Sequence, residues 1–136
     1  HIGVAVKDVE QVARIFTELL GAEPAGEEEL EREGLRVISV AAGDDTIEFF
    51  EPTRPDHTVR RFLDQRGNAL HHICLEVDDL EAELARLVRL GVELVDRAPR
   101  LGAHERRVAF LHPRSTGGIL IELSERPSGG PSDLAP

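Results

Sequence analysis

Four side chains that can bind a metal ion occur as two matching pairs along the chain. The segment HIGVAV at residues 1–6 returns as HICLEV at residues 72–77, and an aspartate follows each copy closely. Glu48 and Glu122 occupy matching places in two later apolar segments. The chain therefore contains two copies of one unit, and each copy begins on a histidine and ends on a glutamate.

Imidazole nitrogen and carboxylate oxygen are both common ligands of divalent metal ions. A glutamate within an apolar strand is unusual, because burial of an unpaired carboxylate is costly. Since the repeat relates these residues, we expect them to face one site where the two copies meet, with positions left open to water or substrate. The predicted metal ligands are His1, Glu48, His72 and Glu122. The alternative interpretation is four ordinary residues at strand edges, which is the usual case for a single histidine at the end of a strand.

The other histidines and the only cysteine are weaker candidates. His71 is adjacent to His72, but alternation along a strand should turn its side chain to the opposite face. His57 lies between the two copies, where we expect it in solvent, and His112 is expected in a turn. Cys74 lies within a predicted strand with no histidine or aspartate placed to activate it, which argues against a thiol enzyme.

Hydrophobic periodicity predicts the strands and helices that must position these residues. The predicted strands are residues 2–6, 35–41, 46–51, 73–77, 92–95, 108–111 and 119–123, with a further strand and loop in the acidic stretch 22–34. Each of the three predicted helices starts at an aspartate and stops at or near a glycine: Asp8 to Gly21, Asp56 to Gly67 and Asp79 to Gly91. We expect Leu19 and Leu20 on the buried face of the first helix.

Each copy thus reads strand–helix–strand–strand–strand, which predicts an α+β fold of two tandem βαβββ modules forming a curved, mostly antiparallel sheet around the metal site. A chain of 136 residues with 40% apolar residues is long enough for one domain with its own core. We assign residues 1–126 to that domain, with module one over about 1–52 and module two over about 70–125. The tail over 127–136 is rich in proline, glycine and serine and is predicted to be disordered. Because the sequence has no methionine, we expect a few residues to precede His1.

The composition also limits the classes of partner that the protein can be expected to bind. A net charge of −10 argues against a nucleic-acid-binding protein, which normally has a basic face. No apolar run is long enough to cross a membrane, and the first residues do not resemble a signal peptide. A single cysteine excludes an internal disulfide and fits a cytoplasmic location.

An anionic small molecule is still compatible with this charge, because a local group of arginines can hold one. The loop over 98–106 is rich in turn residues, and Arg100, His104 and Arg106 are its candidate substrate-binding residues. The alternative is an ordinary surface loop.

Three segments give the chain a family resemblance. They are Ile47–Pro52, the double-histidine strand Leu70–Asp79, and the His-Pro-x-Ser-x-Gly-Gly segment at 112–118 that leads to Ile121-Glu122-Leu123. Together with the first six residues they resemble the vicinal oxygen chelate (glyoxalase/bleomycin-resistance/dioxygenase) superfamily, whose members pair βαβββ modules around a divalent metal. The closer resemblance is to the methylmalonyl-CoA epimerase family.

The resemblance implies metal ligands at His1, His72 and Glu122, with Glu48 at a position that some members fill with glutamine. The implied ion is Co²⁺ first, with Mn²⁺, Ni²⁺, Zn²⁺ or Mg²⁺ as alternatives, and the implied assembly is a homodimer that binds an acyl-CoA substrate. Some members also carry a catalytic glutamate on the second strand, where this chain has Val37. Glu48 and Glu122 are the predicted pair of catalytic acid–base residues, with a metal-bound water or a residue not identified from the sequence as the alternatives to Glu48 for the second base.

The implied activity is a metal-dependent isomerase that interconverts (R)- and (S)-methylmalonyl-CoA by α-proton abstraction through an enolate. A glyoxalase I-type lactoylglutathione lyase would use the same four ligands and is the main alternative. A ring-cleaving dioxygenase would use two histidines and one glutamate on iron, so the extra carboxylate of Glu48 argues against it. A metal-free small-molecule-binding protein of the same fold is the alternative from a different class.

Overall fold

The computed structural model describes residues 1–128. The tail predicted over 127–136 lies, apart from its first two residues, outside the described residues. The chain forms two compact units, His1–Ile73 and Cys74–Pro136. Strand β5 (Ala69–Val77) crosses the boundary and contributes its first half to one unit and its second half to the other.

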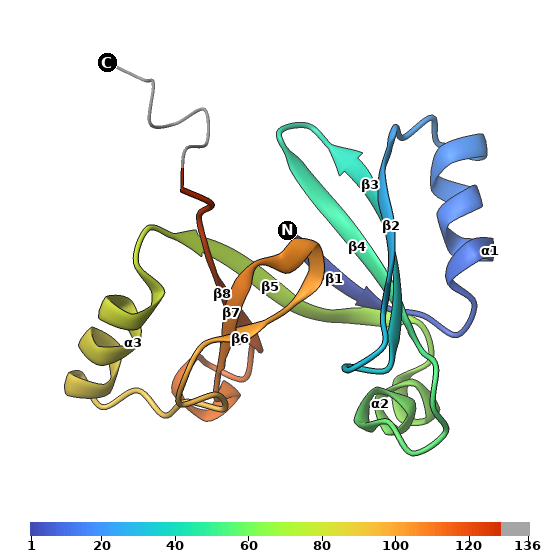
Figure 1. The fold of residues 1–136 in the computed structure, drawn as a ribbon. Coiled ribbons are helices and arrows are strands. Elements are labelled where there is room, and N and C mark those ends of the chain that lie inside the picture. The colour runs from blue at the N-terminus through green and yellow to red at the C-terminus, as the bar shows by residue number, and fades with distance from the viewer. Residues whose placement is uncertain (129–136) are drawn as a thin grey trace. The chain divides into compact units, whose positions relative to one another are not determined.

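The first unit contains four strands and two helices besides the start of β5 (Figure 1). These are β1 (Ile2–Ala5), α1 (Val9–Arg14), a π-helical turn (Ile15–Leu19), β2 (Pro24–Leu30), β3 (Leu35–Ala42), β4 (Asp45–Pro52) and α2 (Thr58–Arg66). The strand order is β2-β3-β4-β1-β5. Strands β1 and β4 pair in parallel, whereas the other pairs of this unit are antiparallel.

The second unit repeats this course from the second half of β5 onward. Its elements are α3 (Leu80–Arg89), β6 (Arg100–Leu101), a 3₁₀ turn (Ala103–Glu105), β7 (Arg107–Leu111), a second 3₁₀ turn (Pro113–Ser115) and β8 (Ile121–Glu125), in the strand order β5-β8-β7-β6. The predicted α+β class and the tandem modules in a mostly antiparallel sheet are confirmed. None of the helices among the described residues is long and apolar enough to cross a lipid bilayer.

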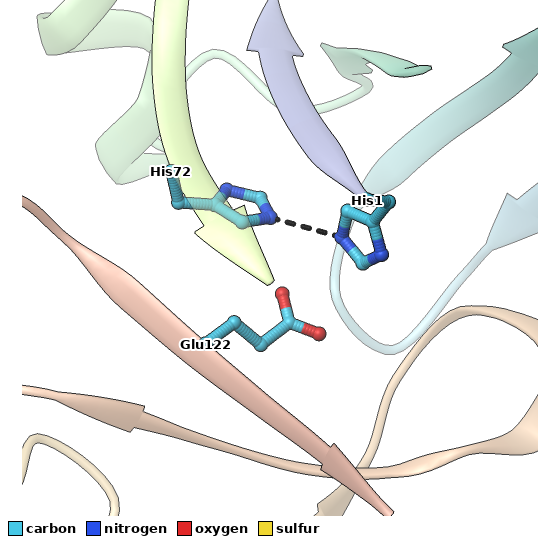
Figure 2. Close-up of side chains that lie close together, drawn as sticks. All are labelled: His1, His72 and Glu122. Carbon is cyan, nitrogen blue, oxygen red and sulfur yellow. Dashed lines mark hydrogen bonds between the residues drawn. The ribbon is translucent and has the colours of Figure 1, made fainter. Parts of the chain in front are cut away.

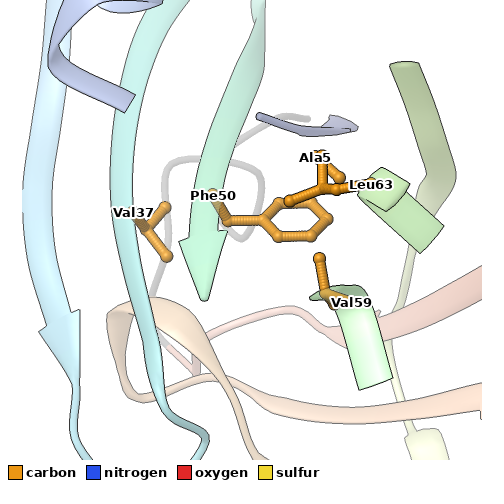
Figure 3. Close-up of a cluster of buried hydrophobic side chains, with 5 residues drawn as sticks. All are labelled: Ala5, Val37, Phe50, Val59 and Leu63. Atoms are coloured by element: carbon orange, nitrogen blue, oxygen red, sulfur yellow. The ribbon is translucent and has the colours of Figure 1, made fainter. Parts of the chain in front are cut away.

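Strands β3 and β4 are buried on both faces, so their side chains fill two separate cores. On one face, Val37 and Phe50 pack with Ala5 and with Val59 and Leu63 of α2 (Figure 3). The opposite face is covered by α1, and its buried residues are Val6, Val9, Ala13, Val40 and Phe49. The second unit has its own core of Leu80, Leu84, Ala109, Leu111 and Leu123. Each unit therefore has enough apolar packing to hold its strands in a fixed register.

The first helix departs from the predicted pattern at its end. The N–H of Leu20 donates to the carbonyl of Ile15 at 3.2 Å, a bond five residues back that marks the wider π turn. The extra residue in this turn rotates the end of the helix away from the apolar stripe. Leu19 and Leu20, predicted to be buried, are instead 77% and 66% exposed.

Two further predictions of local structure are wrong. Helix α2 is capped by His57, not Asp56, because Nδ1 of His57 accepts the N–H of Val59 at 3.0 Å. The ring is not in solvent, since its Nε2–H donates to the carbonyl of Glu33 at 2.7 Å. The predicted strand over 92–95 is reduced to a single bridge between Leu94 and Leu111. The ladder ends there because the N–H groups of Val95 and Asp96 both donate to the carbonyl of Phe110.

Candidate metal centre

The first unit brings together three of the four predicted ligands. His1 directly precedes β1, Glu48 lies on β4 and His72 on β5. The Nε2 atom of His1 is 3.2 Å from Oε2 of Glu48. The same atom is 3.2 Å from Nε2 of His72, the contact drawn as a dashed line in Figure 2. Two donor atoms of the types that divalent metals prefer thus lie next to a third, Nε2 of His1.

Strand pairing explains why these side chains meet. Strand β1 lies between β4 and β5, and Gly3 is paired with Glu48 on one side and with His72 on the other. A Cβ atom built on Gly3 would lie 2.1 Å from Cε1 of His72 and 2.5 Å from both ring nitrogens. Only glycine leaves room for the imidazole to lie over β1 and reach His1.

Both Glu48 and His72 are buried, with 8% and 9% of their surface exposed. A carboxylate withdrawn from water is costly unless a partner compensates its charge. Directly across the β3–β4 pair lies Ser39, which is 2% exposed. Its hydroxyl has no hydrogen-bond partner among the residues the structure describes. The buried face that carries Glu48 therefore also carries the Ser39 hydroxyl as a polar group without a hydrogen-bond partner among the described residues.

The distances fit a metal ion. Two ligand atoms about 2.1 Å from one ion lie roughly 3.0–3.4 Å apart in tetrahedral or octahedral coordination. Both separations from Nε2 of His1 fall in that range. A single ring nitrogen cannot make two linear hydrogen bonds, whereas two neighbouring ligands at this spacing are ordinary around a shared ion. The residues present therefore suit a divalent cation with mixed nitrogen and oxygen ligands.

Glu122, the fourth predicted ligand, belongs to the second unit. It lies on β8, is paired with Phe110 of β7 and is 8% exposed. Within the second unit it is thus a buried carboxylate on a central strand, as the repeat predicts from Glu48. Its membership of the same centre is a prediction.

Arg106, one of the candidate substrate-binding residues, makes several contacts inside the second unit. Its Nη2 donates to Oε2 of Glu76 at 2.7 Å and to the carbonyl of Glu125 at 2.8 Å. Hydrogen bonds from Arg106 and then Arg126 hold the pKa of the Glu76 carboxyl below its ordinary value. These contacts hold Arg106 in place within the second unit. Its contact with a substrate stays a prediction.

Arg100 and His104 lie within a short strand-and-turn segment, Arg100 in β6 and His104 in the 3₁₀ turn that follows. Arg100 pairs with Asp96 at 3.3 Å and lies over the ring of Phe110, with the guanidinium carbon 5.5 Å from the ring centroid. His104 and Glu105 both have left-handed backbone angles, with φ of 58° and 57°. Two consecutive residues of this kind are uncommon outside glycine and store local strain, which is found more often at ligand-binding loops.

His71 also lies against the centre. The pairing of β1 with β5 shifts between Gly3 and Val4, so that Gly3 opposes His72 but Val4 opposes Leu70. His71 is therefore the extra residue of a β-bulge, and its Nδ1 lies 2.9 Å from Nδ1 of His72. The prediction that His71 points to the opposite face is wrong, because alternation holds only along a regular strand.

Comparison with known proteins identifies the family of the chain. A family model of the glyoxalase/bleomycin resistance protein/dioxygenase superfamily matches residues 1–110. An uncharacterized Bacillus subtilis protein, YqjC, is 36% identical over 125 residues, 92% of this chain and 89% of that protein. Human mitochondrial methylmalonyl-CoA epimerase is 32% identical over 126 residues, 92% of this chain and 72% of that protein.

A solved structure has the same fold. The Streptomyces coelicolor methylmalonyl-CoA epimerase in complex with 2-nitronate-propionyl-CoA matches with a TM-score of 0.88 at 30% identity, and the match covers 94% of this chain and 93% of that one. The predicted resemblance is thus confirmed in both sequence and fold. With a family model over most of its length and relatives at this level of identity, the chain belongs to the glyoxalase/bleomycin resistance protein/dioxygenase superfamily.

Proposed function

We propose that this protein is an epimerase that interconverts (R)- and (S)-methylmalonyl-CoA by removing and returning the α-proton. The observation that carries the proposal is the group of His1, Glu48 and His72. Oε2 of Glu48 and Nε2 of His72 each lie 3.2 Å from Nε2 of His1. Relatives that carry the epimerase name align with more than nine-tenths of this chain. The acyl-CoA complex of a structural neighbour supports a substrate of the same class.

The metal centre in this proposal consists of His1, Glu48 and His72 from the first unit and Glu122 from the second. The repeat relates the four residues, and all are of types that bind divalent ions. Co²⁺ is the proposed ion, with Mn²⁺, Ni²⁺, Zn²⁺ or Mg²⁺ as alternatives. When bound, such an ion supplies a Lewis acid that stabilises negative charge on the thioester and carboxylate oxygens of a substrate.

Proton transfer falls to carboxylates of the chain itself. Residues paired directly across two strands point to the same face, and on the face of β3 and β4 that carries Glu48 the paired residues are Leu35–Pro52, Val37–Phe50, Ser39–Glu48 and Ala41–Thr46. Glu48 is the only one of these with an ionisable side chain. A positioned general base contributes about 10²–10⁴-fold, so Glu48 is the proposed base of the first unit and Glu122 that of the second.

The surroundings of Glu48 favour this role. The neighbouring Phe50 and Val37 are 5% and 4% exposed and keep bulk water from this part of the sheet. His1 places a ring nitrogen 3.2 Å from the Glu48 carboxylate and so helps to hold it in position.

The remaining parts of the proposal concern binding and assembly. Arg100, His104 and Arg106 are proposed to contact the acyl or CoA part of the substrate. We further propose a homodimer and a cytoplasmic location, as expected from the family resemblance and the single cysteine.

Proton exchange in D₂O tests the proposal directly. The metal-loaded protein is mixed with (S)-methylmalonyl-CoA, with and without a chelator, and the α-proton is followed by NMR. We expect metal-dependent loss of the α-proton signal together with appearance of the (R) epimer. Absence of exchange with fully metal-loaded protein would overturn the proposed function.

Val37 favours one second candidate. Because this chain has an apolar residue where some epimerases have a catalytic glutamate, a reaction with a single base is also compatible with the first unit. Isomerisation of the glutathione hemithioacetal of methylglyoxal, a glyoxalase I-type reaction, is of this kind. The same protein preparation tests it by following thioester formation in the ultraviolet.

A further inference from the structure

The bulge in β5 places two histidine rings on the same side of the sheet. Regular alternation would separate His71 and His72, but the register of β5 against β1 moves from Leu70–Val4 to His72–Gly3 and leaves His71 as the extra residue. A bulge of this kind re-aims one side chain and increases the local twist. The His71 ring centroid accordingly lies 5.2 Å from that of His72, with the two planes nearly perpendicular at 86°.

Aromatic contacts hold the His71 ring in this position. The edge of the ring meets Phe50 of β4 at a centroid distance of 5.1 Å and Phe62 of α2 at 5.0 Å. Both contacts are T-shaped, the arrangement that aromatic rings prefer. Phe50 of β4 and Phe62 of α2 thus restrict the His71 ring from two sides, and this fixes the direction in which its Nδ1 faces His72.

The nitrogen contact between the two rings has a consequence for tautomers. Nδ1 of His71 and Nδ1 of His72 are 2.9 Å apart, so one of them donates a proton and the other accepts it. His72 points its Nε2 at His1, and a ring nitrogen that binds a metal carries no proton. A neutral His72 that binds through Nε2 must therefore carry its proton on Nδ1, and His71 must be the acceptor.

We propose that His71 is a positioning residue that accepts the hydrogen bond from Nδ1–H of His72 and thereby fixes the tautomer and the ring plane needed for metal binding. The inference rests on the metal centre of the proposed function. Metal-binding histidines usually donate their second N–H to an acceptor that orients the ring, and here a neighbouring histidine on a bulge takes the place of the more usual carboxylate or carbonyl.

Two other contacts limit the position of the His72 ring. Gly3 lies under the ring, where even a methyl group would collide, and Phe50 lies at a centroid distance of 5.7 Å with a tilt of 33°. These contacts limit the position of the ring but do not distinguish its two nitrogens. The hydrogen bond to His71 does distinguish them, and so it selects which nitrogen faces His1.

Two substitutions separate the hydrogen bond from the packing. His71→Leu keeps an apolar side chain between Phe50 and Phe62 but removes the acceptor. His71→Asn retains an acceptor oxygen near the place of Nδ1. His112→Leu, in a turn of the second unit, is the matched control for loss of a histidine elsewhere. Circular dichroism and thermal unfolding check that every variant is folded.

The first readout is the tautomer of His72 in metal-free protein labelled with ¹⁵N-histidine. We expect the wild type and His71→Asn to show His72 protonated on Nδ1, and His71→Leu to show a mixture or the other tautomer. A wild-type His72 protonated on Nε2, or the same tautomer in His71→Leu as in the wild type, would overturn the proposal. This readout does not depend on catalysis.

The second readout is the affinity for Co²⁺, measured by competition with a chelator. Loss of the group that orients a metal-binding histidine typically weakens binding by about 10–100-fold, so we expect that loss in His71→Leu, its partial recovery in His71→Asn and no change in His112→Leu. Unchanged affinity in a folded His71→Leu protein would refute the positioning role. Tight Co²⁺ binding without proton exchange on methylmalonyl-CoA would instead reject the proposed reaction and leave the role of His71 in place.

Discussion

A single methyl group at position 3 should displace the His72 imidazole. In the structure a Cβ atom on Gly3 would lie 2.1 Å from Cε1 of His72, whereas ordinary contacts begin near 3.4 Å. The ring must therefore move by more than about 1 Å to restore normal van der Waals contact. It cannot do so freely, because Phe50 and His71 bound it on other sides.

Such a shift separates Nε2 of His72 from Nε2 of His1, which are now 3.2 Å apart. A displacement of about 1 Å at a reacting site can lower the rate by about 100-fold, and a loosened ligand shell weakens metal binding by about 10–100-fold. For Gly3→Ala we expect losses of this size in kcat/KM and in Co²⁺ affinity. Overpacking should also destabilise the fold by about 1–3 kcal/mol.

The assay must separate loss of the centre from loss of stability. Gly43→Ala is the matched control, since Gly43 has a φ of +66° but nothing within 4 Å of the position that an added methyl group would take. It should destabilise the fold by about 1 kcal/mol through backbone strain alone and leave Co²⁺ affinity unchanged. Chelator competition, proton exchange and thermal unfolding are measured on both variants. If folded Gly3→Ala binds Co²⁺ as tightly as the wild type, the claim that glycine makes room for the ligand is refuted.

Three further substitutions test the buried and the paired carboxylates. Glu122→Ala should abolish epimerisation while the fold stays intact by circular dichroism, and retained turnover would reject its role. Glu48→Gln should stop inversion, because one face of the α-carbon loses its base; NMR in D₂O that shows undiminished inversion would contradict this. Glu76→Gln should lower the free energy of unfolding at neutral pH by less than about 1 kcal/mol, since the pair is partly exposed. Because hydrogen bonds from Arg106 and Arg126 lower the pKa of Glu76 below 4.5, its contribution is present above pH 4.5 and is lost as the pH falls toward the folded pKa. Urea unfolding at neutral pH and well below pH 4.5 should therefore show the difference between Glu76→Gln and the wild type shrinking in acid.

The regular parts of the fold follow closely from the sequence. Strands β3 and β4 were predictable within one residue at each end, because each has apolar residues on both faces and a glycine turn joins them. Asp8 and Asp79 cap their helices as predicted, with each carboxylate accepting an amide of the first turn. The repeat of histidine and glutamate also predicted which ligands of the first unit would meet. The strand ends and helix caps depend on residues close together in the sequence, so the sequence pattern predicts them.

The irregular parts depend on contacts between distant residues. The bulge at His71 arises where β5 must pair with β1 and place the His71 ring between Phe50 and Phe62, and no pattern within β5 alone signals it. His57 caps α2 partly because the backbone carbonyl of Glu33 accepts a hydrogen bond from its Nε2–H. Histidine is a rare cap, so propensity favoured Asp56. In both cases a tertiary contact outweighs a local preference.

The buried face around Glu48 also limits which reaction the protein can perform. Val37 lies in an apolar core and the hydroxyl of Ser39 is no base at neutral pH, so on this face of β3 and β4 only Glu48 can take a proton. Inversion at a carbon needs proton carriers on both of its faces. Among the residues the structure describes, Glu48 and Glu122 are the two buried carboxylates, one in each unit. The proposed epimerisation would use both carboxylates, whereas a single-base isomerisation would need Glu48 alone. The ratio of inversion to simple exchange in D₂O distinguishes the two reactions.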